Sequence, residues 1–247
     1  MKALTALTKT ATRLFVRNPT SMFMALLLPA GLLLLQAYVI PGTREPIAGE
    51  SGLRVIDLFL PVAIAIALTS VAVTNYPSTI GAYRESGVLR RLDVTPVGPA
   101  RVLFAQWIIS GLSFAAATTI TVVLAGVTFG AAAPRSIPLV IAILGLGALT
   151  MMAVGSLIAA VAPSAQAAYG IGLLVFMASL FTAGVWTPGP TMSDPVRDAV
   201  GFTPLGAMTQ QLTAAWYGGS VEGSAFLVMA AWLIVCAIVS AKVFRWR

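Results

Sequence analysis

The chain has 247 residues, of which 58% are hydrophobic and only 9% are charged, and its mean hydropathy is +0.93. A soluble domain carries about 25% charged residues because its surface has to be hydrated. The composition therefore excludes a soluble globule and predicts an integral membrane protein. The sequence has no histidine and one cysteine, Cys236, which excludes Ser-His-Asp and Cys-His catalysis, histidine-ligated metal sites and an internal disulfide.

Residues 1–17 have the pattern of a basic amphipathic helix. At about 100° per residue, apolar side chains share one face and basic side chains the other. The apolar face holds Leu4, Leu7, Ala11, Leu14 and Phe15, and the basic face holds Lys2, Lys9, Arg13 and Arg17. We expect this helix to lie in the inner head-group plane. A secretory signal is the alternative, but here the aliphatic run is longer and starts only near residue 22.

Uncharged stretches predict six membrane-spanning helices, because a helix needs about 20 apolar residues to cross the hydrocarbon core. The predicted spans are residues 22–40, 55–75, 102–128, 138–162, 168–187 and 224–243. The fourth and fifth spans come from one uncharged stretch, which Pro163-Ser164-Ala165-Gln166 divides as a tight turn. No room is left for a soluble domain, so residues 1–247 are expected to form a single all-α transmembrane domain.

The distribution of Lys and Arg predicts the orientation, since short cytoplasmic loops carry the excess of basic residues. With both termini in the cytoplasm, the inner segments hold Lys2, Lys9, Arg13, Arg17, Arg84, Arg90, Arg91, Arg101, Lys242, Arg245 and Arg247. The outer segments hold Arg44, Arg54, Arg135 and Arg197. The +7 charge therefore follows from topology, and nucleic-acid binding is not needed to explain it.

Residues 199–221 are also uncharged and about long enough to cross a membrane. Several polar side chains interrupt them, and a seventh crossing would place the basic C-terminus outside, against the charge rule. A re-entrant hairpin over residues 188–222 on the outer side is the favoured interpretation, and a true crossing is the alternative. Such a hairpin must be buried in protein or line a wet cavity.

The loop between the second and third spans has features of a short helix with one apolar edge. Val88, Leu89 and Leu92 stand among charges at helical spacing, Gly87 permits a bend, and Thr95-Pro96 ends the helix. Such a helix can press apolar side chains into a groove of a partner while its arginines meet carboxylates at the rim. A positive-inside anchor that touches only lipid head groups explains the residues equally well.

The same loop resembles that of the membrane subunits of ABC-2 type exporters, especially bacterial drug and antibiotic efflux permeases. Their loop has the form Glu-x-Gly-x-Leu-x-Arg-Leu-x-x-Thr-Pro, and here Glu85, Gly87, Leu89, Arg91, Leu92, Thr95 and Pro96 fill it. The resemblance implies that residues 84–96 are a coupling helix that docks on an ATP-binding subunit. Arg84, Glu85, Arg90 and Arg91 would then make rim contacts, and Val88, Leu89 and Leu92 would enter the groove.

A second resemblance to this family lies after the fifth span. Gly184, Pro188 and Pro195, followed by Thr203-Pro204-Leu205, are similar to the outer re-entrant segment of these permeases. This resemblance supports the hairpin interpretation of residues 188–222. It also implies two permease subunits, identical or different, around one pathway.

The sequence has no Gly-x-x-x-x-Gly-Lys-Ser/Thr phosphate loop, so we expect no cofactor in this chain and ATP with Mg²⁺ on a separate ATPase subunit. Asp57 is the one ionisable residue that approaches the interior of a span, and Arg54 one turn earlier predicts a local salt bridge. A proton- or ion-coupled carrier usually has a charged residue at mid-membrane. Its absence disfavours that class and favours an apolar or amphipathic cargo.

Together these features predict the permease subunit of an ATP-driven exporter in the bacterial plasma membrane, in contact with lipid and without catalytic or metal-binding residues of its own. Alternating access, driven by the ATPase pushing on residues 84–96, is the expected mechanism. A non-pumping scaffold or lipid-handling protein is one alternative. A membrane-embedded enzyme is another, though it would need an unusual site.

Overall fold

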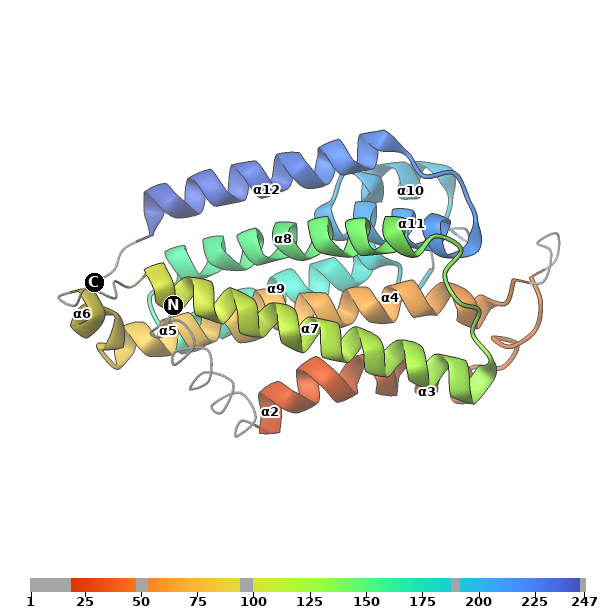
Figure 1. The fold of residues 1–247 in the computed structure, drawn as a ribbon, viewed down its shortest axis with the longest axis horizontal. Coiled ribbons are helices and arrows are strands. Elements are labelled where there is room, and N and C mark those ends of the chain that lie inside the picture. Colours follow the sequence, from red (N-terminus) through yellow and green to blue (C-terminus); the bar gives the residue numbers. More distant parts are fainter. Residues whose placement is uncertain (1–18, 48–52, 94–99, 188–191, 245–247) are drawn as a thin grey trace.

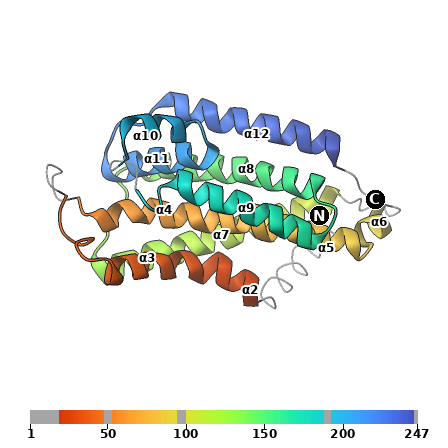
Figure 2. The same cartoon turned by 180° about the vertical axis from the view of Figure 1, so that it is seen from behind.

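The computed structural model describes residues 19–47, 53–93, 100–187 and 192–244, and in this part of the chain every regular element is a helix. The helices pack as an elongated bundle (Figures 1 and 2). One end of the bundle carries the short helix α6 (Val88–Asp93), and the other carries α10 (Asp194–Gly201) and α11 (Pro204–Tyr217). We call these the α6 end and the hairpin end. The predicted helix over residues 1–17 lies outside the described residues.

The centre of the bundle is a single long helix. It consists of α4 (Val55–Thr69), the π-helical η2 (Ser70–Asn75) and α5 (Tyr76–Glu85), and every residue from Ile56 to Thr69 is buried. Hydropathy places the end of this span at residue 75, but the helix continues to Glu85. Ser78 and Thr79 donate hydrogen bonds to carbonyl oxygens one turn earlier, on Thr74 and Asn75. The polar hydroxyls are therefore satisfied within the helix, which lets it extend past the apolar segment.

Five further crossings surround this central helix (Figures 1 and 2). The first is a shorter apolar helix made of α2 (Pro19–Met22), the π-helical η1 (Phe23–Leu27) and α3 (Leu28–Val39). The others are α7 (Ala100–Phe129), α8 (Ile137–Val161), α9 (Ala165–Ala183) and α12 (Gly223–Val243), all long and apolar enough to cross a membrane. The prediction of an all-α membrane protein with six spans is confirmed.

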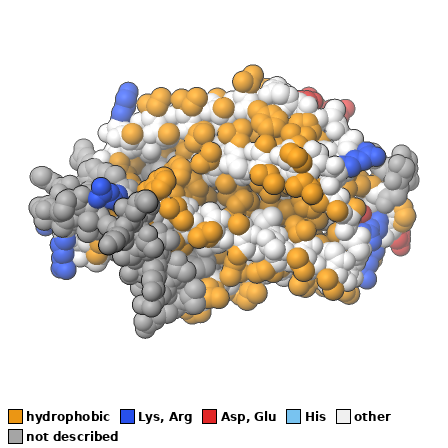
Figure 3. All heavy atoms as spheres, in the orientation of Figure 1, with side chains coloured by type: hydrophobic (Ala, Val, Ile, Leu, Met, Phe, Trp, Pro, Cys, Tyr) orange, Lys and Arg blue, Asp and Glu red, His pale blue; other side chains and the backbone are white. Residues whose placement is uncertain are grey.

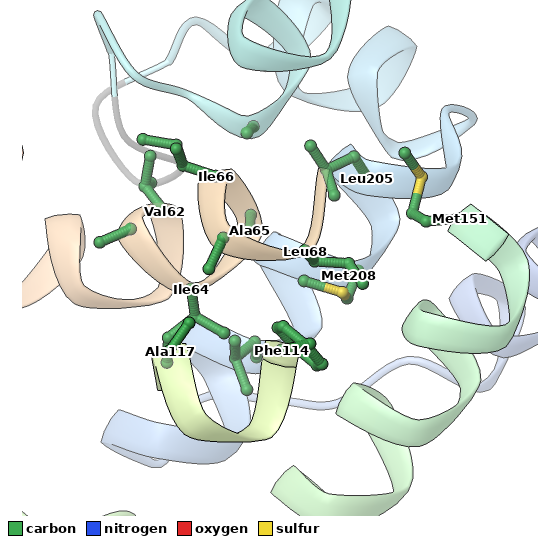
Figure 4. Close-up of a cluster of buried hydrophobic side chains, with 14 of the residues drawn as sticks. Val62, Ile64, Ala65, Ile66, Leu68, Phe114, Ala117, Met151, Leu205 and Met208 are labelled. Carbon is green, nitrogen blue, oxygen red and sulfur yellow. The ribbon is translucent and has the colours of Figure 1, made fainter. Parts of the chain in front are cut away.

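The apolar core forms where α4 meets α7, α8 and α11. Figure 4 shows Ile64 of α4 facing Phe114 and Ala117 of α7, while Leu68 lies beside Met208 of α11. All of these side chains are buried. Lipid tails are as apolar as these residues, so in a bilayer close van der Waals packing holds the helices together rather than the hydrophobic effect.

Two glycines let α8 and α9 approach the π-helical part of the central helix. A Cβ atom on Gly155 of α8 would overlap the carbonyl oxygen of Ala72, and one on Gly172 of α9 would overlap that of Val73. A π-helical turn widens the backbone and is frequent at functional positions of a helix. The central helix is thus held from two sides at the one place where its hydrogen-bond pattern changes.

The segment between α9 and α12 does not cross the bundle. Both α10 and α11 lie at the end where α9 finishes and α12 begins (Figures 1 and 2), so the chain returns to the side that it left. Thr203 caps α11 by accepting a hydrogen bond from the Gly206 amide at 3.1 Å, and Pro204 occupies the first turn. The segment therefore forms a hairpin at one end of the bundle rather than a further pass along it, and its re-entrant position in a membrane stays a prediction.

The surface matches a protein embedded in lipid. In Figure 3 hydrophobic side chains cover the long sides of the bundle, and Lys and Arg gather at its two ends. Large apolar residues are exposed on α7, α9 and α12, among them Val127, Leu174 and Leu227. Such extensive apolar exposure would cause aggregation in water but is expected of helices that face acyl chains.

Candidate functional site

The α6 end is built by a sharp turn between two helices. The central helix ends at Glu85, Ser86 and Gly87 form the turn, and α6 starts at Val88. Gly87 has a φ of 71°, a left-handed conformation that only glycine adopts at low cost. The Arg91 amide donates a hydrogen bond to the Gly87 carbonyl at 3.0 Å, which closes the first turn of α6. The glycine therefore sets the direction in which α6 leaves the bundle.

Arg84, in the last turn of α5, binds the C-terminal end of α8. Its guanidinium donates hydrogen bonds to the carbonyl oxygens of Ala159 at 2.8 Å and Ala162 at 2.7 Å. The last carbonyl groups of a helix have no partner inside the helix and carry the negative end of its dipole, so a cation there is favourable. The same guanidinium lies 5.2 Å from the ring centroid of Phe244, just after α12.

Glu85, the next residue, binds the N-terminal end of α9. Its carboxylate accepts a hydrogen bond at 3.0 Å from the amide of Ala165, the first residue of that helix. This end carries the positive part of the helix dipole, so the carboxylate is favourable there. Gly81 lies one turn earlier, and a Cβ atom on it would come within 2.7 Å of the Ala165 Cα. Because Gly81 has no side chain, α5 comes close enough to α9 for the Glu85 carboxylate to reach the Ala165 amide.

Arg84 and Glu85 together hold the turn between α8 and α9, residues 162–165, and we call this arrangement the clasp. Each charge meets the helix end of opposite partial charge, and each such contact stabilises by about 0.3–1 kcal/mol, or up to about 2 kcal/mol when partly buried. The clasp joins the end of the central helix to two other crossings at the point where α6 begins. The clasp therefore connects α8 and α9 to the part of the chain from which α6 extends.

The sequence predicts that the side chains of residues 84–96 contact an ATPase subunit, but in the structure some of them contact the permease itself and others are exposed. Arg84 and Glu85 are engaged inside the chain, and Leu89 is fully buried within it. Arg90 and Arg91 are exposed, and neither guanidinium forms a hydrogen bond or ion pair with any described residue. Val88 is half-buried and Leu92 lies in α6. Thr95 and Pro96 lie outside the described residues.

The residues that Arg84 and Glu85 contact could not be identified from their own side chains. Ala159, Ala162 and Ala165 contribute backbone groups, and nothing in their side chains distinguishes them. The turn Pro163-Ser164 is the one sequence signal that could have indicated these partners. It joins the C-terminal end of one helix, where a cation is favourable, to the N-terminal end of the next, where an anion is favourable. Arg84-Glu85 supplies both charges.

At the hairpin end, the residues of the predicted re-entrant motif have structural roles. Gly184 has a φ of 85° and ends α9, Pro195 lies in the first turn of α10, and Leu205 is buried. Thr203 and Pro204 start α11 as described above. Pro188 lies outside the described residues. The motif thus specifies where helices begin and end.

Hydrogen bonds fasten α11 to the rest of the hairpin end. The Trp216 indole donates to the carbonyl of Ala132 at 2.9 Å, and the Tyr217 hydroxyl donates to the carbonyl of Asp57 at 2.7 Å. These contacts join α11 to the connection between α7 and α8 and to the start of the central helix. Burial of the ring raises the pKa of the Tyr217 hydroxyl, with the Asp57 charge adding to this effect. The hydroxyl therefore remains a donor at physiological pH.

The predicted salt bridge between Arg54 and Asp57 is confirmed, with a distance of 2.8 Å between guanidinium and carboxylate. The hydrogen bonds with Asp57 raise the pKa of the Arg54 guanidinium, which also donates to the carbonyl of Phe129 at 2.8 Å. Asp57 also accepts from the Arg54 amide, so its carboxylate satisfies a backbone donor at the start of the central helix. Its role is structural.

Six apolar crossings, five of them packed around a buried central helix, define a polytopic α-helical membrane protein, with no metal-binding cluster of His, Cys, Asp or Glu among its described residues. The family model described as ABC-2 type transporter matches residues 2–217, and the chain belongs to this family. No curated protein matches the chain by sequence. The family confirms the resemblance noted in the loop and identifies the chain as a permease component of an ABC transporter, which partners an ATPase subunit.

Proposed function

We propose that this chain is the permease subunit of an exporter that moves an apolar or amphipathic cargo outward across the bacterial plasma membrane. Two permease subunits enclose the pathway, and a separate ATPase binds ATP and Mg²⁺. The α6 end faces the cytoplasm and the hairpin end faces outward, as the distribution of Lys and Arg indicates. The observation that carries the proposal is the clasp, which links the exposed α6 to three membrane-crossing helices at once.

The ATPase contacts the exposed side of α6. Arg90 and Arg91 project from it without a partner among the described residues, and arginine pairs well with carboxylates at the rim of an interface. Leu89 fixes α6 to its own bundle, because its side chain is fully buried there. The α6 helix is therefore both a contact surface and a rigid extension of the permease.

The clasp converts movement of α6 into movement of the bundle. When ATP binding brings the ATPase subunits together, α6 is displaced, and Arg84 and Glu85 carry the turn between α8 and α9 with it. Gly155 and Gly172 hold these two helices against the π-helical segment of the central helix. The three helices therefore tilt together, which opens the pathway toward the hairpin end.

The test is co-expression with a P-loop ATPase subunit chosen from the same genome, followed by affinity purification and measurement of ATP-driven efflux. Arg90→Glu with Arg91→Glu should abolish co-purification, because the charge reversal places repulsion at the rim. Arg44→Glu is the matched control, since Arg44 is an exposed arginine at the opposite end. Co-purification that survives the double reversal would refute docking on α6.

Replacement of Glu85 distinguishes binding of the ATPase to α6 from transmission of its movement to the bundle. Glu85→Ala should leave co-purification intact and lower efflux severalfold, because the α9 amide loses its acceptor while Arg90 and Arg91 remain. Glu85 is exposed, so loss of this helix-end contact corresponds to about 0.3–1 kcal/mol. Glu85→Gln, which keeps an acceptor without the charge, should retain part of the efflux. Undiminished efflux from well-expressed Glu85→Ala protein would contradict the role of the clasp.

A further inference from the structure

A cavity of about 640 Å³ opens at the hairpin end, among the start of the central helix, the connection between α7 and α8, and α11. Leu53 and Leu58 contribute apolar surface, and Arg135, Gln211 and Glu222 contribute polar groups. A neighbouring cavity of about 440 Å³ shares Gln211 and Glu222. Neither the docking proposed for α6 nor the contacts of the clasp involve this cavity.

Gln211 supplies unpaired hydrogen-bond donors to the cavity. The residue is 6% exposed, and its side-chain oxygen accepts a hydrogen bond from the Glu222 amide at 2.8 Å. That contact fixes the side-chain amide, so its nitrogen carries two N–H groups that have no acceptor among the described residues. The side chain lines the cavity, so an acceptor on a bound molecule there can take these N–H groups.

Arg135 supplies a positive charge to the same cavity. A Cβ atom on Gly218 would overlap the Arg135 guanidinium, so the glycine at this turn, with a φ of 90°, makes the space that the guanidinium occupies. The guanidinium has no hydrogen bond or ion pair with any described residue. Arg197, which also lines the cavity, is paired with Asp194.

Glu222 supplies a negative charge. Its carboxylate accepts one hydrogen bond, from the Ser224 hydroxyl at 3.3 Å, and forms no ion pair with a described residue. Arg135 and Glu222 therefore line one cavity without neutralising each other. An anion alone would be repelled by Glu222, and a cation alone by Arg135, so a ligand that carries both charges fits best.

We propose that this cavity binds the zwitterionic head group of an amphipathic molecule. Its phosphate or carboxylate lies between the Arg135 guanidinium and the Gln211 amide, its amine lies at Glu222, and its apolar part contacts Leu53 and Leu58. Charge-assisted hydrogen bonds to both ends give selectivity over molecules with one charge. The biological meaning rests on the proposed export function, in which the hairpin end is where cargo leaves the membrane.

The test measures binding to the full chain purified in a non-ionic maltoside detergent, so that no lipid head group competes. Glycerophosphoethanolamine is the zwitterionic probe, glycerol 3-phosphate the anionic probe and ethanolamine the cationic probe, each titrated by calorimetry. The zwitterion should bind most tightly. Arg135→Gln should weaken its binding roughly tenfold and remove its advantage over ethanolamine, because a charged hydrogen bond is lost.

Glu222→Gln is the reciprocal variant and should remove the advantage of the zwitterion over glycerol 3-phosphate. Gln211→Leu should weaken both phosphate probes. Arg44→Gln is the matched control, because Arg44 lies over the Tyr38 ring, 4.0 Å from its centroid, and does not line the cavity. It should change none of the three affinities.

Equal binding of the three probes, absence of zwitterion binding, or unchanged selectivity in both charge variants would overturn the proposal. Arg135 and Glu222 are exposed, so their variants are expected to fold, which gel filtration verifies. The assay contains no ATPase, so its failure would leave the permease function standing. Failure of the ATPase to co-purify would in turn leave the binding site intact.

Discussion

At the scale of single residues, the closest contacts of the bundle depend on missing side chains. Gly155 and Gly172 face carbonyl oxygens of the central helix so closely that a methyl group would overlap them. On the same two helices, a methyl group at Gly145 or Gly170 would meet no atom of a neighbouring element within 4 Å. These four glycines look alike in the sequence, and the structure distinguishes the pair that lets backbones meet.

Gly155→Ala and Gly172→Ala should each destabilise the bundle by about 1–3 kcal/mol, the usual cost of inserting a methyl group into a packed site. The backbone carbonyls that they would meet cannot rotate away as a side chain would. Gly145→Ala and Gly170→Ala should be neutral or slightly stabilising, because alanine has the higher helix propensity. Thermal unfolding of the four variants in detergent measures the difference, and equal effects within each helix would contradict this account of the packing.

Residue chemistry also explains what the sequence could and could not predict. Six crossings follow from apolar length, because bilayer thickness acts on composition alone, whereas the orientation inferred from Lys and Arg stays a prediction. The clasp depends on three backbone groups of alanines, which carry no sequence signal. Arg84 and Arg90 are both arginines in one charged loop, and the fold alone places one inside the bundle and the other on its surface.

At the scale of elements, the central helix and α6 act as a lever with a bend. The helix continues past Asn75, where the predicted span ends, as far as Glu85, and in this extension Ser78 and Thr79 bond to backbone carbonyls of the same helix. This extension carries Gly81, Arg84 and Glu85 to the turn between α8 and α9. The central helix therefore continues without a break up to Glu85, and Gly87 sets the angle between this helix and α6.

Gly87→Ala should impair coupling without much effect on the stability of the bundle. An L-residue at this left-handed position costs about 1–2 kcal/mol, and the strain can be relieved by reorienting α6 rather than by unfolding the crossings. Permease-dependent ATPase stimulation should fall several-fold, while thermal unfolding stays near that of the parent protein.

Gly87→Asn is the matched variant, because asparagine adopts the left-handed conformation more readily than alanine does. It should retain more ATPase stimulation than Gly87→Ala. If the two variants behaved alike, the backbone conformation of Gly87 would not be what couples α6 to the bundle.

At the scale of the whole molecule, the two ends differ in chemistry. The α6 end carries exposed arginines and the clasp, to which we assign coupling, whereas the hairpin end carries a cavity lined by unpaired charges, to which we assign head-group binding. The apolar sides between them face lipid (Figure 3). A cargo that is apolar along most of its length and charged at its head would find matching surfaces along this path.

The orientation of these two ends can be tested by labelling single cysteines in intact cells. Ser86 and Ser220 are both exposed, one at the α6 end and one at the hairpin end, and the native Cys236 is 2% exposed and can be replaced by alanine. A membrane-impermeant maleimide should label Ser220→Cys in intact cells and Ser86→Cys only after permeabilisation. Thiol reactivity requires access of the reagent, so the comparison reports which end meets the outside. The reverse labelling would place α6 outside, beyond the reach of any cytoplasmic ATPase, and the coupling proposed for the clasp would then be impossible.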